Sequence, residues 1–391
     1  MKNRNVLISG ASIAGPSLAF WLSRYGFQPT IVERAPAVRP GGYAIDFRGA
    51  SMKVLERMGI LADVRRMQTR TGTITIVDKD HRKIASMPDG FTSGELEIMR
   101  GDLAELLHDA TRQDTEYIFN DSIAGMKTTE GGVEVTFERS QPRTFDLVVG
   151  GDGLHSRVRA LAFGDEAKFT RHLGYYCSIF SIPNYLDLGQ NALYYGTVGK
   201  KVGIFGRNDR EAKASFFFDS PMLEYDRRDV EQQKRILREQ FAGDVWEAPR
   251  LLQMMDDAPD FYFDAVSQIK MDRWSAARTV LLGDAGYCGS PLSGMGTSMA
   301  MVGAYVLAGE LKQAAGDHTI AFACYEALMR DFVNRCQKLA EGADWFVPRT
   351  RWKLWLSTQM WRMLPYTPWK NMMIDVPVKI GNSIRLKDYS S

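Results

Sequence analysis

The sequence predicts an α/β protein in three parts: a parallel-sheet domain that is discontinuous in sequence, an antiparallel β-sheet inserted into it, and a helical C-terminal segment. A strand–turn–helix–strand pattern fills residues 5–34. Two further apolar strands, within residues 145–159 and 278–300, each run directly into a glycine-containing turn and a helix. Between them, residues 170–270 are rich in aromatic and β-branched stretches, which is typical of antiparallel strands.

The composition is that of an ordinary globular protein. The chain has 391 residues, 45% hydrophobic and 25% charged, with a formal net charge of +2. It has no basic block and no apolar run of membrane length, so we expect neither nucleic acid nor stable membrane association. Its four cysteines and five histidines have no metal-ligand spacing. We therefore expect free thiols and no bound metal. A strand begins within five residues of the N-terminus, so we also expect no signal peptide and a cytoplasmic location. We expect a monomer.

The first motif is the turn between the first predicted strand and the first predicted helix. Pro16 suits the first helical turn, Gly26 ends the helix, and the strand after it ends on Glu33. This Rossmann-like unit places a dinucleotide pyrophosphate on a helix N-terminus and a ribose hydroxyl on the acid. The candidate cofactor-binding residues here are Gly10, Ser12, Ile13, Ala14, Gly15, Glu33 and Arg34. A plain glycine-rich βαβ turn is the alternative interpretation.

Two arginines follow on segments that return past this turn. Arg48 lies after the Pro40-Gly41-Gly42 loop, and we expect either a solvated loop arginine or a donor to a cofactor or substrate. A helix is predicted over residues 50–67. Arg100 lies in the first turn of another helix, where it either faces solvent or points back to a bound phosphate chain.

The second motif is a Gly-Asp-Gly turn after a buried strand. The backbone of Gly153 permits close approach, and Asp152 is placed to accept a hydrogen bond from a ribityl or ribose hydroxyl. An ordinary strand–turn–helix with an Asp cap is the alternative.

The third motif is the most specific. A buried strand ends at Gly283-Asp284, and a loop with Pro291, Gly294, Met295 and Gly296 leads into a long helix over residues 297–312. Unpaired N–H groups at that helix start suit an electron-rich ring edge, such as that of a reduced flavin. Asp284 would accept a hydroxyl of the ribityl chain.

The C-terminal part is predicted to be helical over residues 320–346 and 351–363. It holds five of the eight tryptophans: Trp345, Trp352, Trp355, Trp361 and Trp369. Helices docked on the core and a lid over the substrate both fit this pattern.

Taken together, the three motifs resemble the class A flavoprotein monooxygenases, the single-component FAD-dependent aromatic hydroxylases, from Val6 to about Lys312. Residues 10–15 with Glu33 look like the FAD adenosine site, Asp152-Gly153 like the family's Asp-Gly motif, Gly283-Asp284 with residues 291–296 like the flavin site, and Arg100 like the pyrophosphate arginine. Ser12, Gly286-Tyr287, Met295 and Ser298 depart from the family pattern. The strings RPGGYAIDFRG, MRGDL, SIPNYLDL and GDAGYCGSPLSG are similar to the tetracycline-inactivating branch.

The resemblance implies an FAD-binding domain over residues 1–169 and 271–318, a substrate domain over residues 170–270 and a C-terminal helical cap over residues 319–391. It also implies an enzyme that uses NADPH or NADH and O2 to hydroxylate an aromatic or polycyclic phenol or enol, of tetracycline type in the narrower match, through a flavin C4a-hydroperoxide. Arg48 is the candidate catalytic residue and also a candidate FAD contact.

Three other functions stay open. A halogenase of this fold would carry a Trp-x-Trp-x-Ile-Pro string, which is absent. A flavin-dependent reductase of isoprenoid double bonds fits poorly with the aromatic insertion. A flavin-binding sequestering or regulatory protein without turnover is the alternative from another class, because the family's Gln and His positions are altered here.

Overall fold

The computed structural model describes residues 2–39, 41–69, 72–87, 94–368 and 372–389. Its first layer is a six-stranded sheet in the order β17-β18-β11-β1-β2-β7. The strands are β1 (Asn5–Ser9), β2 (Gln28–Glu33), β7 (Glu116–Phe119), β11 (Leu147–Gly150), β17 (Ser275–Ala276) and β18 (Thr279–Leu281). All pairings are parallel except that of β17 with β18. The three strands that precede the glycine motifs, β1, β11 and β18, are therefore neighbours, and their carboxyl ends share one edge.

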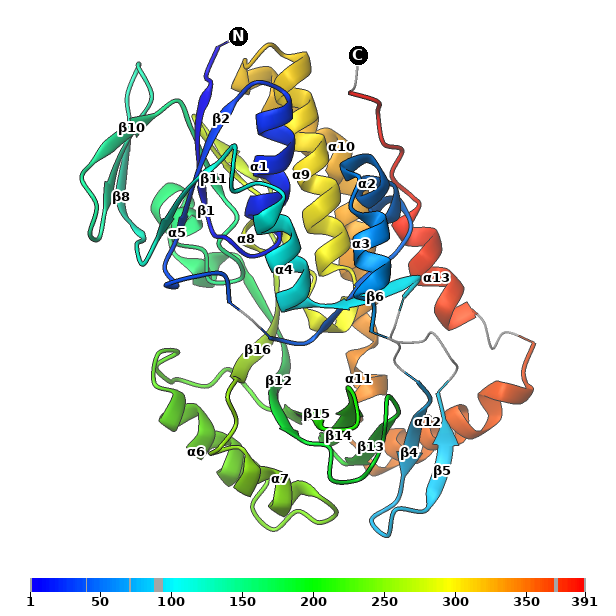
Figure 1. Ribbon diagram of the computed structural model, residues 1–391. Coiled ribbons are helices and arrows are strands. Elements are labelled where there is room, and N and C mark those ends of the chain that lie inside the picture. The colour runs from blue at the N-terminus through cyan, green and yellow to red at the C-terminus, as the bar shows by residue number, and fades with distance from the viewer. Residues whose placement is uncertain (1, 40, 70–71, 88–93, 369–371, 390–391) are drawn as a thin grey trace.

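Helices cover this sheet (Figure 1). The helix α9 (Gly296–Gln313) is buried along almost its whole length between α1 (Ala14–Arg24) and α10 (His318–Lys338). A two-stranded ribbon of β3 (Ala44–Phe47) and β6 (Leu96–Met99) leads into α4 (Arg100–Asp109). The helix predicted over residues 50–67 is wrong as one element. Gly59, at φ +80°, ends α2 (Ala50–Met58), and α3 (Leu61–Arg66) begins again two residues later.

An antiparallel three-stranded sheet lies at the side of this domain. It consists of β8 (Ile123–Thr128), β9 (Val133–Phe137) and β10 (Arg143–Phe145), and its chain returns into the central strand β11. The strict alternation of buried and exposed residues in β9 matches a sheet with one covered face.

The predicted antiparallel insertion is confirmed as a seven-stranded sheet in the order β16-β12-β15-β14-β13-β4-β5. Its strands are β12 (Thr170–Pro183), β13 (Ala192–Thr197), β14 (Lys200–Gly206), β15 (Glu211–Asp219), β16 (Phe261–Ile269), β4 (Ile74–Val77) and β5 (Lys83–Ser86). The last two strands come from far earlier in the chain than residue 170, and β4 joins β13 in parallel. The division of the chain into domains at residues 169 and 271 stays a prediction.

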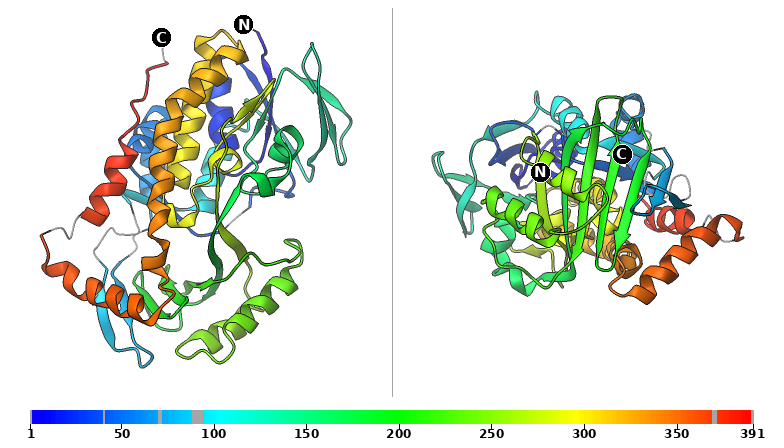
Figure 2. Two further views of the ribbon diagram at one scale, coloured as in Figure 1. Left: turned by 180° about the vertical axis from the view of Figure 1, so that it is seen from behind. Right: turned by 90° about the horizontal axis from the view of Figure 1, so that it is seen from below.

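The two faces of this sheet have different partners (Figure 2). One face, which includes Phe180, Phe216 and Phe218, packs on α6 (Val230–Gln240) and α7 (Ala248–Met254). The opposite face, which includes Cys177 and Phe217, packs on α11 (Ala343–Phe346) and on Leu292 of the third motif. That opposite face is therefore the one directed towards the glycine motifs.

The C-terminal segment wraps around both parts of the molecule. The helix α12 (Arg351–Met363) lies on β5 and buries Trp361, whereas Trp352 and Trp355 stack on each other and are exposed. The helix α13 (Met372–Gly381) then returns to the first domain. Trp369 lies outside the described residues. Among the described residues, we find no helix whose length and hydropathy would allow it to cross a bilayer.

Lys201 is an unusual residue of the motif-facing side of the sheet. Its side chain is 7% exposed, and its Nζ lies 3.9 Å from the ring centre of Phe346 and 5.1 Å from that of Tyr194. Among the described residues no ion pair involves its ammonium, and burial is the only influence that shifts its pKa. Burial lowers the pKa of Lys201 to about 7.

We therefore expect Lys201→Met to raise the free energy of unfolding by on the order of 2 kcal/mol at or below pH 7. Between pH 7 and 10.5 the folded chain holds fewer protons at Lys201 than the unfolded chain. The buried charge of Lys201 therefore lowers the free energy of unfolding by its full amount below pH 7, and this destabilisation decreases as pH rises from 7 to 10.5. Urea unfolding at pH 6.5 and 9.5 measures this, with the exposed Lys127→Met as control. An equal gain at both pH values would contradict the prediction.

Candidate functional site

The first two glycine motifs touch through their backbones. Gly10 adopts φ +103°, and a Cβ there would lie 2.6 Å from the carbonyl oxygen of Gly151. A Cβ on Gly15 would lie only 2.0 Å from the carbonyl oxygen of Gly10. Neither position has room for a side chain, so these glycines are required by close approach as the sequence predicted.

The third motif closes against the first. A Cβ on Gly283 would meet the methyl groups of Ala14 and Ala300 at 3.4 Å each, and one on Gly296 would lie 3.9 Å from a carboxylate oxygen of Asp284. Residues 10–15, 150–153 and 283–296 therefore form one site at the carboxyl edge of β1, β11 and β18. This site is named the glycine edge below.

Glu33 and Arg100 hold the turn of residues 10–15 in shape through their hydrogen bonds. The Glu33 carboxylate accepts hydrogen bonds from the backbone N–H groups of Ala11 and Ala35, at 2.9 and 3.0 Å. Arg100 donates to the Ser12 hydroxyl at 3.2 Å and to two carbonyls of the 39–41 loop. Arg34 is exposed and has no polar contact among the described residues, so the structure does not bring it to this group.

The carboxylate of Asp152 bonds to groups that follow it closely in the sequence. Its carboxylate accepts hydrogen bonds from the Ser156 hydroxyl and from the N–H groups of Arg157 and Val158. It therefore helps to fix the start of α5 (Arg157–Phe163), whose N-cap residue is Ser156, and its role towards a cofactor stays a prediction. Gly153, at φ +85°, borders open space.

Asp284 follows β18 at the glycine edge. It begins the short helix α8 (Asp284–Tyr287) and is exposed, yet the protein around it raises the pKa of its carboxyl by desolvation. The same carboxylate raises the pKa of Tyr43, although burial is the larger cause. The Tyr43 ring lies 6.0 Å from that of Tyr262 on β16, so Tyr43 lies between the surroundings of Asp284 and the seven-stranded sheet.

Arg48 is buried, with 5% exposure, and is not a solvated loop residue. Its Nη1 donates to the carbonyl of Gly294 at 2.7 Å and lies 3.1 Å from the carboxylate of Asp46. Its backbone N–H lies within 3.3 Å of the hydroxyls of Ser51 and Ser298. Arg48 thus joins β3 to the loop of the third motif.

Sequence reasoning missed three of these partners. Asp46 is two positions before Arg48, so alternation along the strand puts both side chains on one face, and this signal could have found it. Ser51 and Ser298 bond to each other at 2.9 Å across 247 positions, a proximity without any local sequence signal. Tyr287, at a departure from the family pattern, is buried and bonds to the Tyr325 hydroxyl at 2.8 Å, so it serves the core.

The helix starts at the glycine edge suit an anionic ligand. Neither α1 nor α9 has a side-chain cap, and neither has an acid in its first turn. Their first N–H groups and positive dipole ends therefore lie at the glycine edge, where the carboxylate of Asp284 is the acidic group beside the start of α9. Ile13, Ala14 and Met295 are buried there, and Pro291 is exposed. Backbone donors, an accessible carboxylate and glycine turns together fit the pyrophosphate, ribityl chain and ring of FAD.

The carboxyl of Asp46 gives a pH-dependent test of this corner. Burial is the largest cause that raises its pKa to about 7, against the opposing effect of Arg48. The folded chain therefore binds more protons than the unfolded chain between about pH 4 and 7, and this group lowers stability as pH rises through that window.

Asp46→Asn should therefore gain stability over the natural chain as pH rises from 4 to 7, by on the order of 2 kcal/mol at pH 8. Denaturant unfolding at pH 5 and pH 8 measures the difference, and exposed Asp257→Asn is the control. A difference that stays the same at both pH values would show that Asp46 ionises normally.

The comparisons agree with this geometry. The model of the family described as FAD binding domain matches residues 3–319. A protein of Legionella longbeachae named flavin-dependent monooxygenase is 42% identical over 343 residues, covering 86% of this chain and 88% of that protein. The crystal structure of tetracycline destructase Tet(51) superposes with a TM-score of 0.87 at 35% identity, covering 98% of this chain and 99% of that one. Tetracycline destructase Tet(55) gives 0.84 at 38% identity and 99% of each chain.

The family match covers all three glycine motifs and most of the chain, and the fold likeness extends over the C-terminal helices as well. This chain belongs to the FAD-binding-domain family, as its three motifs predicted.

Proposed function

We propose that this protein is an FAD-dependent monooxygenase that uses NADPH or NADH and O2 to hydroxylate a polycyclic phenol or enol of tetracycline type. In the net reaction the reduced nicotinamide, a proton and O2 are consumed. One oxygen atom enters the substrate as a hydroxyl group and the other leaves as water. The chemistry that FAD supplies when bound is hydride acceptance and O2 activation.

The observation that carries this proposal is the glycine edge together with what faces it. The carboxylate of Asp284 acts on Tyr43, and the Tyr43 ring lies 6.0 Å from that of Tyr262, so the glycine edge and the seven-stranded sheet approach each other there. A cofactor seated on the glycine edge would therefore have its ring beside the sheet, where a second, aromatic molecule can stack.

The chain's own residues would hold and orient the two molecules. We propose that the starts of α1 and α9 bind the pyrophosphate and the ring edge, that Arg100 neutralises a phosphate, and that Asp284 accepts a ribityl hydroxyl. Arg48 would hold the loop of the third motif through Gly294. It would in this way fix the position of the flavin ring edge relative to that loop. Asp152 would act mainly by fixing the start of α5.

The tetracycline class is supported by shape and by the relatives. Leu292 of the third motif and Phe346 of α11 belong to one apolar cluster on the motif-facing side of the sheet. A wide, flat, fused ligand would contact several such side chains at once. The chain also matches the structures of two tetracycline destructases, at 35% and 38% identity, over essentially the whole length of both.

The test is turnover by the purified yellow protein. Incubated with NADPH, O2 and a tetracycline, it should consume NADPH faster with the drug than without, and the drug should gain one oxygen atom by mass spectrometry and lose its absorbance band. NADPH oxidation that gives only hydrogen peroxide would remove tetracyclines as substrates. Bound FAD without NADPH oxidation for any phenol or enol tested would favour a sequestering protein.

Asp284→Ala should weaken FAD binding by roughly 10- to 100-fold, because a hydroxyl acceptor of about 1–3 kcal/mol is removed. Flavin fluorescence titration of the deflavinated protein measures the dissociation constant. Exposed Asp114→Ala is a control that should bind FAD unchanged. An affinity for FAD within twofold of the natural chain would remove Asp284 from the site.

A further inference from the structure

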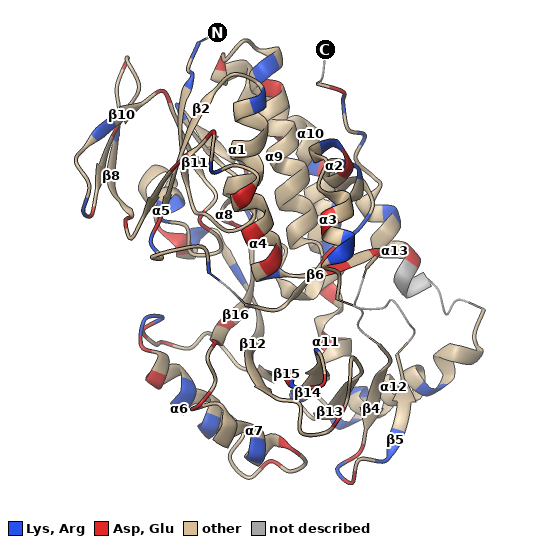
Figure 3. Ribbon diagram, viewed as in Figure 1, with Lys and Arg blue, Asp and Glu red and all other residues tan. Residues whose placement is uncertain are grey.

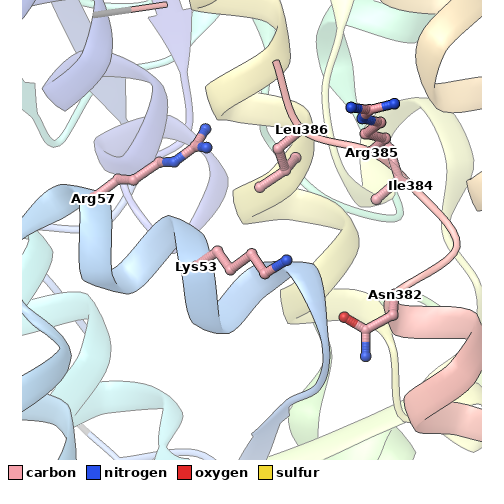
Figure 4. A pocket seen from close by; sticks show the side chains of 6 residues that line it. All are labelled: Lys53, Arg57, Asn382, Ile384, Arg385 and Leu386. Carbon is pink, nitrogen blue, oxygen red and sulfur yellow. The ribbon is translucent and has the colours of Figure 1, made fainter. Parts of the chain in front are cut away.

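A second candidate site lies away from the glycine edge, between α2 and the chain that follows α13. It is a pocket of about 310 Å³, lined by Lys53 and Arg57 of α2 and by Asn382, Ile384, Arg385 and Leu386 of residues 382–389 (Figure 4). Residues 382–389 are called the tail below. The volume is at the lower end of the range for small-molecule sites.

The pocket walls are fixed by the way the tail is anchored. Tyr389 is 1% exposed, and its hydroxyl donates to the carboxylate of Glu310 on α9. Lys387 donates to the same carboxylate at 2.8 Å, and Lys312 donates to the carbonyl of Tyr389 at 2.6 Å. The tail is therefore seated in a defined position on α9, and the pocket is a built feature of the fold.

Arg57 is preorganised on the other wall. Its Nη1 donates to the carbonyl of Lys387 at 2.8 Å and to the hydroxyl of Tyr305, and its guanidinium lies 5.1 Å from the Tyr305 ring centre. Both hydrogen bonds use Nη1, and no hydrogen bond from its other two nitrogen atoms is found within the described part of the chain. An arginine held in this way loses little conformational entropy when it binds an anion.

The lining of the pocket is cationic, and the nearest tail carboxylate that acts on its surroundings is that of Asp388, beside Tyr305. Three of the six lining side chains are cationic and none is acidic. Lys53 and Arg385 make no ion pair or hydrogen bond through their side chains among the described residues. The nearby carboxylate of Glu310 is already shared by Lys387 and Tyr389. Figure 3 shows blue segments on both α2 and the tail.

We infer that this pocket binds a phosphate group, either as the free ion or at the end of a small molecule, through Lys53, Arg57 and Arg385. Guanidinium and ammonium groups are the usual partners of phosphate oxygens. Ile384 and Leu386 offer an apolar surface for an attached base or ring, and the Asn382 amide offers a polar contact. Two sources share this chemistry: free inorganic phosphate, and the 2′-phosphoadenosine end of NADPH.

The pocket is connected to the glycine edge by short stretches of chain. Lys53 lies one helical turn after the Arg48-Gly49 corner. A Cβ on Gly381, the last residue of α13, would lie 2.8 Å from the carbonyl oxygen of Arg48. Phosphate binding itself does not depend on the proposed reaction. Only the assignment of the phosphate to NADPH rests on the proposed function.

The test is calorimetric titration of the FAD-loaded protein at low salt with inorganic phosphate and with adenosine 2′,5′-bisphosphate. Lys53→Glu/Arg385→Glu should weaken binding of the probe by about 10- to 100-fold. Lys127→Glu/Arg235→Glu makes the same change of net charge at exposed positions elsewhere and should leave binding within about twofold. Lys53→Met/Arg385→Met serves if the charge reversal disturbs folding, which flavin absorbance and thermal unfolding report.

Binding of either probe that is lost only in the pocket variants supports the site. Absence of binding by the natural chain, or equal loss in the pocket and control variants, overturns it. A raised KM for NADPH with unchanged KM for NADH and unchanged kcat assigns the phosphate to the dinucleotide. Unchanged KM for both, with loss of phosphate binding, assigns it to free phosphate. A protein without turnover would still give the titration result, so failure of the proposed function is distinguishable.

Discussion

The contact on which the candidate site depends is the meeting of backbones at Gly10, Gly15 and Gly151. A side-chain carbon at either of the first two positions would overlap a carbonyl oxygen, at 2.6 and 2.0 Å. Because of this contact, the turns after β1 and β11 lie directly against each other. Backbone groups at the starts of the helices, more than side chains, therefore line the glycine edge. The position of Gly283 against Ala14 extends the same arrangement to β18. The site is therefore mostly backbone, which explains why Ser12 and Met295 are compatible with it despite departing from the family pattern.

The second organising feature is the Arg48 corner, where segments from distant parts of the sequence share one polar network. Arg48 bonds to Gly294, Ser51 bonds to Ser298, and Gly381 packs on the carbonyl of Arg48. Buried polar groups need such partners, because leaving one unpaired costs about 1–3 kcal/mol. The C-terminal helices are thus tied to the loop of the third motif as well as to the sheet, and Phe346 packs in the same cluster as Leu292. A segment attached at both places can influence the glycine edge and the motif-facing side of the seven-stranded sheet together.

Much of this could be predicted from the sequence because the signals are local. The strand–turn–helix–strand pattern, the three glycine motifs and the antiparallel insertion depend on periodicity and on glycine positions within a few residues of each other. These signals predicted the fold class, the flavin-binding family and the region of the site. The break at Gly59 within a predicted helix shows the limit of the same reasoning, because one left-handed glycine outweighed a continuous apolar pattern.

Only the tertiary structure decided which polar groups the site residues use. Asp152 bonds to the first N–H groups of α5, Arg34 is exposed, and Arg48 is buried against Asp46. It also decided that β4 and β5 complete the sheet of residues 170–270, and that the tail and α2 enclose a cationic pocket. The physical reason is common to all of these. A side chain's partner is set by which segments fold against it, and pairings across tens or hundreds of positions leave no periodic trace in the sequence.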